Sequence, residues 1–493
     1  MSDIYMPGLK SRFNSEKIID DLMKIERLPK ERTEKNIDSL ENNKTWWKDL
    51  GVRIKTLRES AQMLYSFQNP FNERIVLSSN EKIITASATR EAEKREYQLS
   101  VKQLAQADRW LSPPIDEKMA IDAGAYKFTM GNETVAFEFK GGSLREFADI
   151  LNRQGRGKIS ASFMTVQPGT KSILVESKIS GEGNGIIFSA EGAAADLADD
   201  MKQISAAQDA VISLEGIEMK RPSNSINDII PGVTITARGV SDRPEQLEIQ
   251  SDIEGIKNSI FSLVGNYNRL MAEINVLTAR RVASSGFNTS VDESIINELS
   301  YLTPDEAAQM RERLGAFSGD TTLTQFKANM QRTVASFYPT DEERDLAVLA
   351  QIGISTNVRG SGGGGYSPSQ LRGYLDIDEK VLDAAIEDHL GAVRQLFASD
   401  TTGDLIVDTG VAFQLDALAR PFVETGGIIG LKTGAIDSRI SQDQRRIDTM
   451  DRQLALKEAD LKIQYSRMES AYDRMEKMSS SLDNFSRQNS NNR

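Results

Sequence analysis

The stretch that decides the fold is residues 440–482, which read ISQDQRRIDTMDRQLALKEADLKIQYSRMESAYDRMEKMSSSL. Large apolar side chains recur in it every seven residues without interruption, at Ile440, Ile447, Leu454, Leu461, Met468, Met475 and Leu482. The position three residues after each of them is less regular and is polar at Asp443, Lys457 and Gln464. A seven-residue repeat is typical of helices that pack lengthwise against other helices, so the segment is predicted to carry one strong and one weak apolar seam.

This C-terminal helix is predicted to be long and to need a partner. No proline or glycine occurs between Ala435 and Arg493, and a helix over 440–485 would be roughly 70 Å long. Burial of its seven large apolar side chains is worth about 10–20 kcal/mol in all. Without that burial such a helix is marginal in water, so we expect the tail to be mobile in the monomer and ordered on assembly.

The N-terminal region repeats the heptad pattern. Two sets of residues have seven-residue spacing there: Leu40, Trp47, Ile54 and Ala61, and Leu50, Leu57 and Leu64. A shorter helix with Ile18, Leu22 and Ile25 on one face precedes them, and Pro29 is predicted to break or restart the helix. A third heptad helix is predicted over 253–277. Because these helices are far apart in sequence and can form one bundle, the middle of the chain is predicted to be an insertion.

The middle is predicted to be β-rich. Period-two alternation or β-branched runs predict strands at 97–101, 126–130, 135–139, 172–176 and 233–236. Gly131-Asn132 is a plausible hairpin turn. Ser143 and Glu146 form a capping-box pattern in front of a short helix. Two β-rich lobes, one nested within the other, are expected.

The predicted fold class is therefore α+β multidomain, with terminal helices that form a coiled-coil leg and a helical bundle, and two nested β-rich head domains between them. The expected ranges are 1–45 and 436–493 for the leg; 46–75, 253–280 and 320–435 for the bundle; 76–110 and 205–250 for the first head domain; 111–204 for the second head domain; and 281–319 for an irregular insertion.

Composition limits the classes of function. The 493 residues contain no cysteine and one histidine, His389, which excludes thiolate chemistry and any site that needs two histidines. The net charge of −12 is concentrated in residues 67–430, and an acidic centre argues against nucleic acid as a partner. No apolar run is long enough for membrane insertion. Residues 1–10 lack the apolar region of a cleavable secretory signal.

Candidate sites of chemistry have simpler interpretations. The glycines at 362–365 are followed by Tyr366 instead of the Gly-Lys-Ser/Thr of a phosphate loop, so a linker is expected there. His389 has acidic neighbours in an amphipathic helix and no visible nucleophile partner. Residues 375–379 resemble half a calcium loop but lack its glycine, and Asp378 as a helix N-cap explains them better. We expect no catalytic residues, no cofactor and no metal.

Short motifs along nearly the whole chain resemble the flagellar filament cap family, also called FliD or the second hook-associated protein. They are IYMPG at 4–8, FNSEKIIDDLM at 13–23, LSVKQLAQA at 99–107, GGSL at 141–144, ILN at 150–152, AQDAVISLEG at 207–216, RPSNSINDIIPGVT at 221–234, YN at 267–268, GDTTL at 319–323, IGIS at 352–355, GYLDIDE at 373–379 and VRQLF at 393–397. Each motif alone is weak, whereas their order over about 400 residues is distinctive. Residues 281–316 fit the family pattern poorly.

The resemblance implies a ring of several copies, commonly five, at the tip of the filament. Such a ring would retain exported flagellin and promote its folding and insertion, after export of the chain by the flagellar type III route. The implied partners are further copies of the chain, flagellin and hook–filament junction proteins, with an export chaperone at the C-terminal helix as a further candidate. The tip would be extracellular, or periplasmic for an internal flagellum. The predicted subunit or filament interface comprises Leu40, Trp47, Ile54, Ile440, Ile447, Leu454, Leu461, Met468, Met475 and Leu482.

Two alternatives remain open from the sequence. One is another axial flagellar component, such as a hook–filament junction protein. Such proteins also have helical ends but lack the block at 207–234. The other is a surface adhesin that uses the acidic β-rich lobes. An enzyme is disfavoured because no convergent set of catalytic residues is visible.

Overall fold

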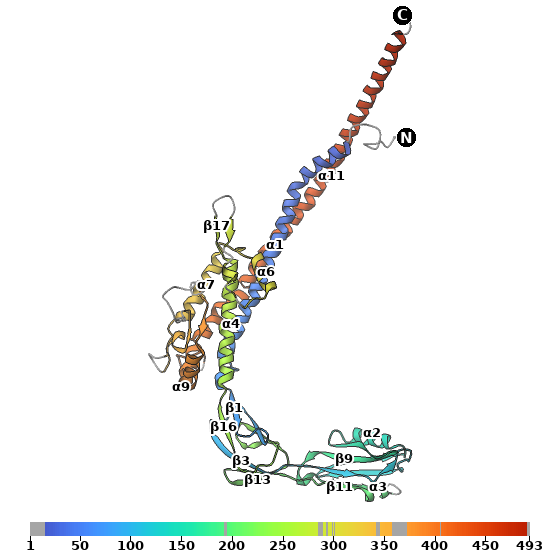
Figure 1. Ribbon diagram of the computed structural model, residues 1–493, viewed down its shortest axis with the longest axis vertical. Coiled ribbons are helices and arrows are strands. Elements are labelled where there is room, and N and C mark those ends of the chain that lie inside the picture. The colour runs from blue at the N-terminus through green and yellow to red at the C-terminus, as the bar shows by residue number, and fades with distance from the viewer. Residues whose placement is uncertain are drawn as a thin grey trace. The chain divides into compact units, whose positions relative to one another are not determined.

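The computed structural model (Figure 1) describes residues 15–191, 195–283, 289–291, 294–297, 299, 301–341, 346–356, 372–404 and 406–490. The chain divides into two compact units, Met1–Phe67 with Lys257–Arg493, and Gln68–Ile256. The first unit is helical and the second is β-rich, which confirms the predicted fold class. The glycine-rich segment expected to be a linker lies outside the described residues.

The helical unit is built from two long helices and several shorter elements. Its helices are α1 (Ser15–Tyr65), α4 (Ile253–Leu277, which begins in the β-rich unit), α5 (Ser294–Asn297), α6 (Pro304–Glu312), α7 (Thr321–Ala335), α9 (Glu379–Phe397), α10 (Val411–Val423) and α11 (Ile428–Ser490), with the short 3-10 helix η4 (Leu349–Ile352). Two small antiparallel pairs accompany them, β17 (Arg281–Ala283) with β18 (Thr289–Val291) and β19 (Ile354–Ser355) with β20 (Asp376–Ile377).

Helix α1 corrects the expectation of a break at Pro29. The helix runs through Pro29, and the Thr33 hydroxyl donates to the Pro29 carbonyl at 3.0 Å. Proline in a helix interior removes one hydrogen bond, and side chains buried on both sides of it, Met23 and Ile37 among them, offset that cost. The buried face of the first turns was also wrong, because Ile19 and Met23 are buried while Leu22 and Ile25 are exposed.

Several local predictions for the helical unit are confirmed. α4 has the bounds expected from its heptads, and Ile256, Ile260, Tyr267, Leu270 and Ile274 on it are buried. Asp378 caps α9, since its carboxylate accepts from the backbone N–H groups of Lys380 and Val381. Within the stretch expected to be irregular, α6 is a helix that Thr303 opens with a complete capping box.

The first lobe of the β-rich unit contains two antiparallel sheets. One has the order β1 (Arg74–Ser78), β16 (Glu245–Ser251), β3 (Glu96–Gln103), β12 (Ala210–Leu214) and β13 (Ile217–Arg221), and the other β14 (Ser225–Ile230), β15 (Val233–Ala237) and β2 (Ile84–Ala88). Alternate side chains of these strands bury a shared core that includes Leu99, Ile212 and Ile235. The short 3-10 helix η1 (Pro70–Asn72) precedes β1.

The second lobe also has two sheets. Their orders are β10 (Ile186–Ala190), β6 (Gly124–Met130), β7 (Glu133–Phe139), and β11 (Lys202–Ser205), β4 (Ala107–Leu111), β9 (Thr170–Ser180), β5 (Ile115–Asp116), with β8 (Ile159–Gln167) paired to β9. Helices α2 (Leu144–Gln154), η2 (Glu182–Asn184) and α3 (Ala195–Asp200) complete it. The predicted hairpin joins β6 to β7, and Gly131 adopts the positive φ of 51° that its turn requires. The capping box of Ser143 and Glu146 is present at α2.

The second lobe is inserted between β3 and β12 of the first. The chain leaves and returns side by side, because Gln106 and Gln208 form a backbone bridge. The motif at 221–234 fastens this point, since the Asn224 amide bonds both the N–H (2.8 Å) and the carbonyl (2.9 Å) of Ala105. β4 pairs only with strands of the second lobe, so the boundary expected between residues 110 and 111 falls inside a strand and moves to Ala107.

Candidate functional site: the paired terminal helices

α1 and α11 lie side by side and antiparallel (Figure 1). Polar contacts join the two helices along their length, and the residue numbers increase on α1 while they decrease on α11, as expected for antiparallel helices. The contacts are Ser15 with Glu469, Arg27 with Glu458 (3.8 Å), Lys30 with Asp451 (2.6 Å), Asn36 with Asp443 (2.6 Å), and Lys44 with Asp437. Most of these pairs are exposed, and exposed pairs are worth about 0–1 kcal/mol each, so they set the register of the helices more than their stability. Asp443, predicted to weaken the seam, thus serves as a register contact.

The apolar heptad residues of α11 do not form one seam with α1. Ile447 is 6% exposed, whereas Met468, Met475 and Leu482 are 44%, 66% and 68% exposed; Ile440, Leu454 and Leu461 are intermediate. In a straight helix of 3.6 residues per turn, a strict seven-residue repeat drifts by about 20° per heptad. The repeat therefore rotates away from α1 toward the C-terminus.

Polar residues share the contact with α1 beyond Ile447. After Ile447 they include Glu458, which is half-buried, and Glu469, which is 2% exposed and accepts a hydrogen bond from Ser15. Ile447, Glu458 and Glu469 are eleven residues apart, the spacing of 3.67 residues per turn that a nearly straight helix pair follows. Ile447 belongs to both series, so the contact with α1 follows the heptad as far as Leu461 and leaves it from Met468 onward.

A stripe of exposed apolar side chains remains at the C-terminal end of α11. We call it the tail stripe, and it comprises Met468, Met475, Met478 and Leu482. Figure 1 shows α11 continuing well beyond the start of α1, so the described part of α1 supplies no cover for its last turns. Leu22 and Ile25 on α1 and Leu456 and Ile463 on α11 are exposed as well. Such a surface can bind other apolar surfaces.

Two of the predicted interface residues lie in the bundle of this same chain. Trp47 is 4% exposed and stacks on Phe317 with ring centroids 4.7 Å apart, and the Lys432 ammonium lies 5.0 Å from its ring centroid. Ile54 is fully buried, whereas Leu40 is half-buried on the leg. Lys432 also pairs with Asp320 at 2.8 Å. Burial alone would raise the pKa of Asp320, but the Lys432 ammonium and the N-terminal amides of α7 outweigh it and lower that pKa.

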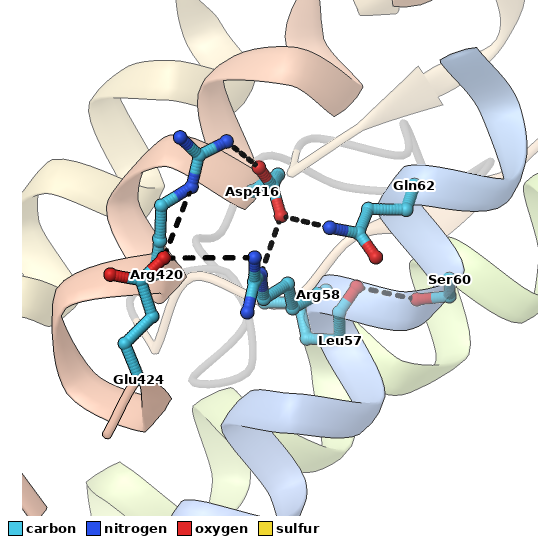
Figure 2. A network of polar contacts seen from close by, with 7 residues as sticks. All are labelled: Leu57, Arg58, Ser60, Gln62, Asp416, Arg420 and Glu424. Atoms are coloured by element: carbon cyan, nitrogen blue, oxygen red, sulfur yellow. Dashed lines mark hydrogen bonds and ion pairs between the residues drawn. The ribbon is translucent and has the colours of Figure 1, made fainter. Parts of the chain in front are cut away.

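A buried carboxylate ties α1 to α10. Asp416 is fully buried, and it accepts hydrogen bonds from Arg58 (2.8 Å), Gln62 (2.9 Å) and Arg420 (2.6 Å), as Figure 2 shows. Glu424 lies 3.8–3.9 Å from both arginines. Burial would raise the pKa of Asp416, but the bonds from Arg420 and Arg58 outweigh it and lower the pKa below its ordinary value. The network fixes the end of α1 where it joins the bundle.

An arginine-lined cavity of about 400 Å³ lies between α1, α4 and α6. It is lined by Asp49, Val52, Arg53, Thr56, Asn266, Arg269, Gln309 and Arg313. Behind it, fully buried Glu273 pairs with Arg313 at 2.6 Å and with Arg53 at 3.4 Å. The sequence interpretation missed this cluster because it treated 281–319 as irregular. A carboxylate at position 273, within the apolar stretch of a heptad helix, was the signal that could have revealed it.

The described part of 281–319 packs on α4. Ile296, Leu299 and Met310 form a buried cluster with Ala272 and Val276 of that helix. Across the ranges that the structure describes, no group of three acidic or histidine side chains is placed to hold a metal ion. None of the described helices is both long enough and apolar enough to cross a bilayer.

Comparison with known proteins supplies the family. A model described as "Flagellar hook-associated protein 2 C-terminus" matches residues 207–477, more than half of the chain, and one described as "Flagellar hook-associated protein 2 N-terminus" matches residues 11–108. The chain belongs to the flagellar hook-associated protein 2 family, the FliD family of flagellar filament cap proteins. The C-terminal match includes both the block at 207–234 and most of α11.

Relatives within this family cover about nine-tenths of the chain. Flagellar hook-associated protein 2 of Treponema maltophilum is 27% identical over 92% of this chain and 94% of its own length. Flagellar hook-associated protein 2 of Treponema pallidum is 24% identical over 90% of this chain and 93% of its own length. The crystal structure of the D1-D2-D3 domains of the flagellar cap protein FliD from Escherichia coli aligns with a TM-score of 0.55 over 80% of this chain and 99% of that one, at 22% identity. The two share the fold.

Proposed function

We propose that this chain assembles with further copies of itself into a ring of about five at the tip of the flagellar filament. The ring retains exported flagellin and promotes its folding and insertion during filament growth. Contacts with hook–filament junction proteins precede filament growth, and an export chaperone covers the C-terminal helix beforehand. The chain reaches the tip through the flagellar type III route, and the tip is extracellular, or periplasmic if the flagellum is internal. No covalent chemistry is part of this role.

The observation that carries the proposal is the tail stripe. Met468, Met475 and Leu482 in it keep a strict seven-residue repeat on a face of α11 that the described part of α1 does not cover. A strict heptad faces a partner continuously only when several helices supercoil around one another. Covering side chains such as Met475 and Leu482 stabilises a complex by about 1.5–3 kcal/mol each. Copies of this chain, or helices of filament subunits, supply that cover.

The β-rich unit supports the retaining part of the role. It contributes two nested lobes with separate cores, in an otherwise helical chain. In a ring, such lobes form a plate over the growing end, while the leg helices contact the filament. The block at 207–234, which holds the insertion point of the second lobe, favours a cap over a hook–filament junction protein. An adhesin role for the lobes is compatible with capping and is not needed to explain any described feature.

A gene-deletion experiment tests the proposed function. Cells that lack the gene should release monomeric flagellin into the medium and carry short or absent filaments, and the restored gene should reverse both effects. Normal filaments without leaked flagellin would refute the capping role.

A second experiment tests the tail stripe. The double variant Met475→Glu, Leu482→Glu should keep the helical content of the monomer but lose assembly in sedimentation velocity, and it should fail to restore filaments. The matched control is Ser480→Glu, Asn484→Glu, which adds the same two negative charges at exposed residues on the opposite face of the same turns. If the control disrupts assembly as strongly as the stripe variant, net charge causes the loss and the stripe is not the interface.

A further inference from the structure

Strand β8 is an open edge with no charged side chain. Its sequence is ISASFMTVQ, and it hydrogen-bonds to β9 alone among the named strands. From Ser162 onward every residue is exposed, and Phe163, Met164 and Val166 are 37%, 45% and 46% exposed. Soluble proteins usually protect such edges with charges, proline, bulges or a covering element, because an open edge pairs with other strands.

The first half of β8 has protection of this kind. Asn152, at the end of α2, donates from its side-chain amide to the Ala161 carbonyl (2.9 Å) and accepts from the Ala161 N–H (2.8 Å). The amide thereby takes the place that a neighbouring strand would occupy. Beyond Ala161 no side chain among the described residues holds the edge in this way, and the ladder to β9 runs regularly to Thr165 before its register shifts ahead of Gln167. Side-chain protection therefore stops where exposure of the apolar side chains begins, and a register irregularity lies at the far end of the strand.

The direction of the open backbone groups follows from the ladder. Lys158 accepts from the Lys178 N–H at 2.7 Å, so even-numbered residues of β8 bond toward β9. Ala161 bonds to Asn152 on the other side, which gives the same alternation independently. The N–H and C=O groups of Phe163 and Thr165 consequently point away from the sheet, symmetrically about Met164.

We propose that residues 162–166 pair antiparallel with the same residues of a second copy of this chain, across a two-fold axis at Met164. In this register Phe163 exchanges both backbone hydrogen bonds with the partner's Thr165, and Thr165 does the same with the partner's Phe163. Met164 lies opposite the partner's Met164 as a non-hydrogen-bonded pair, whose Cα atoms are about 4.5 Å apart. Val166 lies opposite the partner's Ser162. The two sheets then continue into one.

The pairs formed in this register favour a second copy as the occupant. In a two-fold contact each residue meets its symmetry mate, so Phe163 faces Thr165, an aromatic and a β-branched side chain, and Met164 faces itself. None of these pairs contains a charge, so no like charges are set opposite each other. The edge strands β7 and β13 carry charges, whereas β10 and β2 are uncharged like β8.

This contact is independent of the proposed ring. A two-fold contact differs from the head-to-tail contacts that close a ring of five, so it joins head lobes of two assemblies or of two free chains. Its test must therefore be read separately from assembly through the leg.

Single cysteines test the pairing in the full-length protein, which has no cysteine of its own. Under mild oxidation Met164→Cys should form disulfide-linked dimers at least about tenfold faster than Val166→Cys, because only the former lies opposite itself within the Cα separation that a disulfide spans. An equimolar mixture of Ser162→Cys and Val166→Cys should cross-link, while each alone should not. Equal rates for Met164→Cys and Val166→Cys, or no dimer from either, would overturn the proposal.

Two further variants distinguish pairing through β8 from association through the leg and from chance collision of exposed thiols. Met164→Cys should still cross-link when Met475→Glu and Leu482→Glu are also present, since the tail stripe does not take part. Adding Thr165→Pro to Met164→Cys removes the outward N–H without removing a bond to β9, and it should suppress the cross-link with circular dichroism unchanged. Loss of the cross-link in the first variant, or its persistence in the second with folding intact, would contradict pairing through β8.

Discussion

The side-chain amide of Asn268 takes both backbone hydrogen-bonding groups of Leu375, at 2.7 Å each. Asn268 lies on α4, and Leu375 is a buried residue in front of β20. The same arrangement recurs between Asn224 and Ala105, where the lobes meet, and between Asn152 and Ala161 on β8. In each of these three places an asparagine side chain bonds the backbone N–H and C=O groups that a neighbouring strand would otherwise bond.

Asn268→Ala should destabilise the helical unit by about 2–4 kcal/mol, because it leaves the buried N–H and C=O of Leu375 without partners. Urea unfolding of the full-length protein, followed by circular dichroism, measures the free-energy change. Asn266→Ala is the matched control on the same helix, since Asn266 makes only a 3.5 Å contact to Ser262, and it should change stability by less than about 0.5 kcal/mol. Equal effects of the two variants would mean that the hydrogen bonds from Asn268 to Leu375 do not stabilise the helical unit.

Asp416→Asn should cost about 2–4 kcal/mol at pH 7, because it removes the charge that Arg58 and Arg420 neutralise inside the bundle. The pKa of Asp416 is lowered in the folded state, so its stabilising contribution is present above its ordinary pKa near 3.8 and is lost as pH falls below that value. The difference between wild type and variant should therefore shrink between pH 5 and about pH 3.

Thermal or urea unfolding across that pH range checks the Asp416 prediction. Glu424→Gln is the control, since Glu424 is 53% exposed and its loss should matter by at most about 1 kcal/mol. A difference between wild type and Asp416→Asn that stays constant down to pH 3 would mean that the carboxylate charge is not what stabilises the network.

Trp47→Ala should destabilise the bundle by about 3–5 kcal/mol through loss of its buried contact with Phe317 and Lys432. Trp46→Ala should cost less, because Trp46 is half-buried and meets Phe317 only edge-on at 6.4 Å. Unfolding monitored by circular dichroism gives both values. A larger loss of stability for Trp46→Ala than for Trp47→Ala would mean that Trp46, and not Trp47, is the main core residue of this region.

Pro29→Ala should stabilise α1 by about 2 kcal/mol, because it restores the missing backbone hydrogen bond at an exposed position of a continuous helix. The midpoint of thermal unfolding should rise, whereas Glu31→Ala at a neighbouring exposed position should leave it nearly unchanged. A lower midpoint for Pro29→Ala would show that the proline has a structural role that outweighs its cost.

The sequence predicted the elements better than their surroundings. Heptad spacing sufficed for α4 and for the continuous α11, and cap residues sufficed for α2 and α9, because these features depend on neighbours along the chain. The continuity of α1 through Pro29 could not be predicted, since packing on α11 decides it. The exposure of Met475 could not be predicted either, because it depends on the accumulated drift between a seven-residue repeat and an unsupercoiled helix.

For the candidate surfaces, too, the sequence predicted the positions with the right spacing but not which of them tertiary packing buries. The predicted interface residues were chosen by period alone, which does not distinguish Trp47, buried by Phe317 of the same chain, from Leu482, which is 68% exposed. The open half of β8 depends on where the Asn152 side chain reaches, and that is a matter of tertiary structure. Whether the exposed residues contact other subunits stays a prediction.

The backbone bridge between Gln106 and Gln208 has a consequence for how this molecule can vary. Because the chain departs from and rejoins the first lobe at adjacent points, everything between them behaves as a cassette. A domain of another size or antigenic character could be grafted there, with Asn224 and Ala105 as the fixed seam, while the rest of the polypeptide keeps its packing.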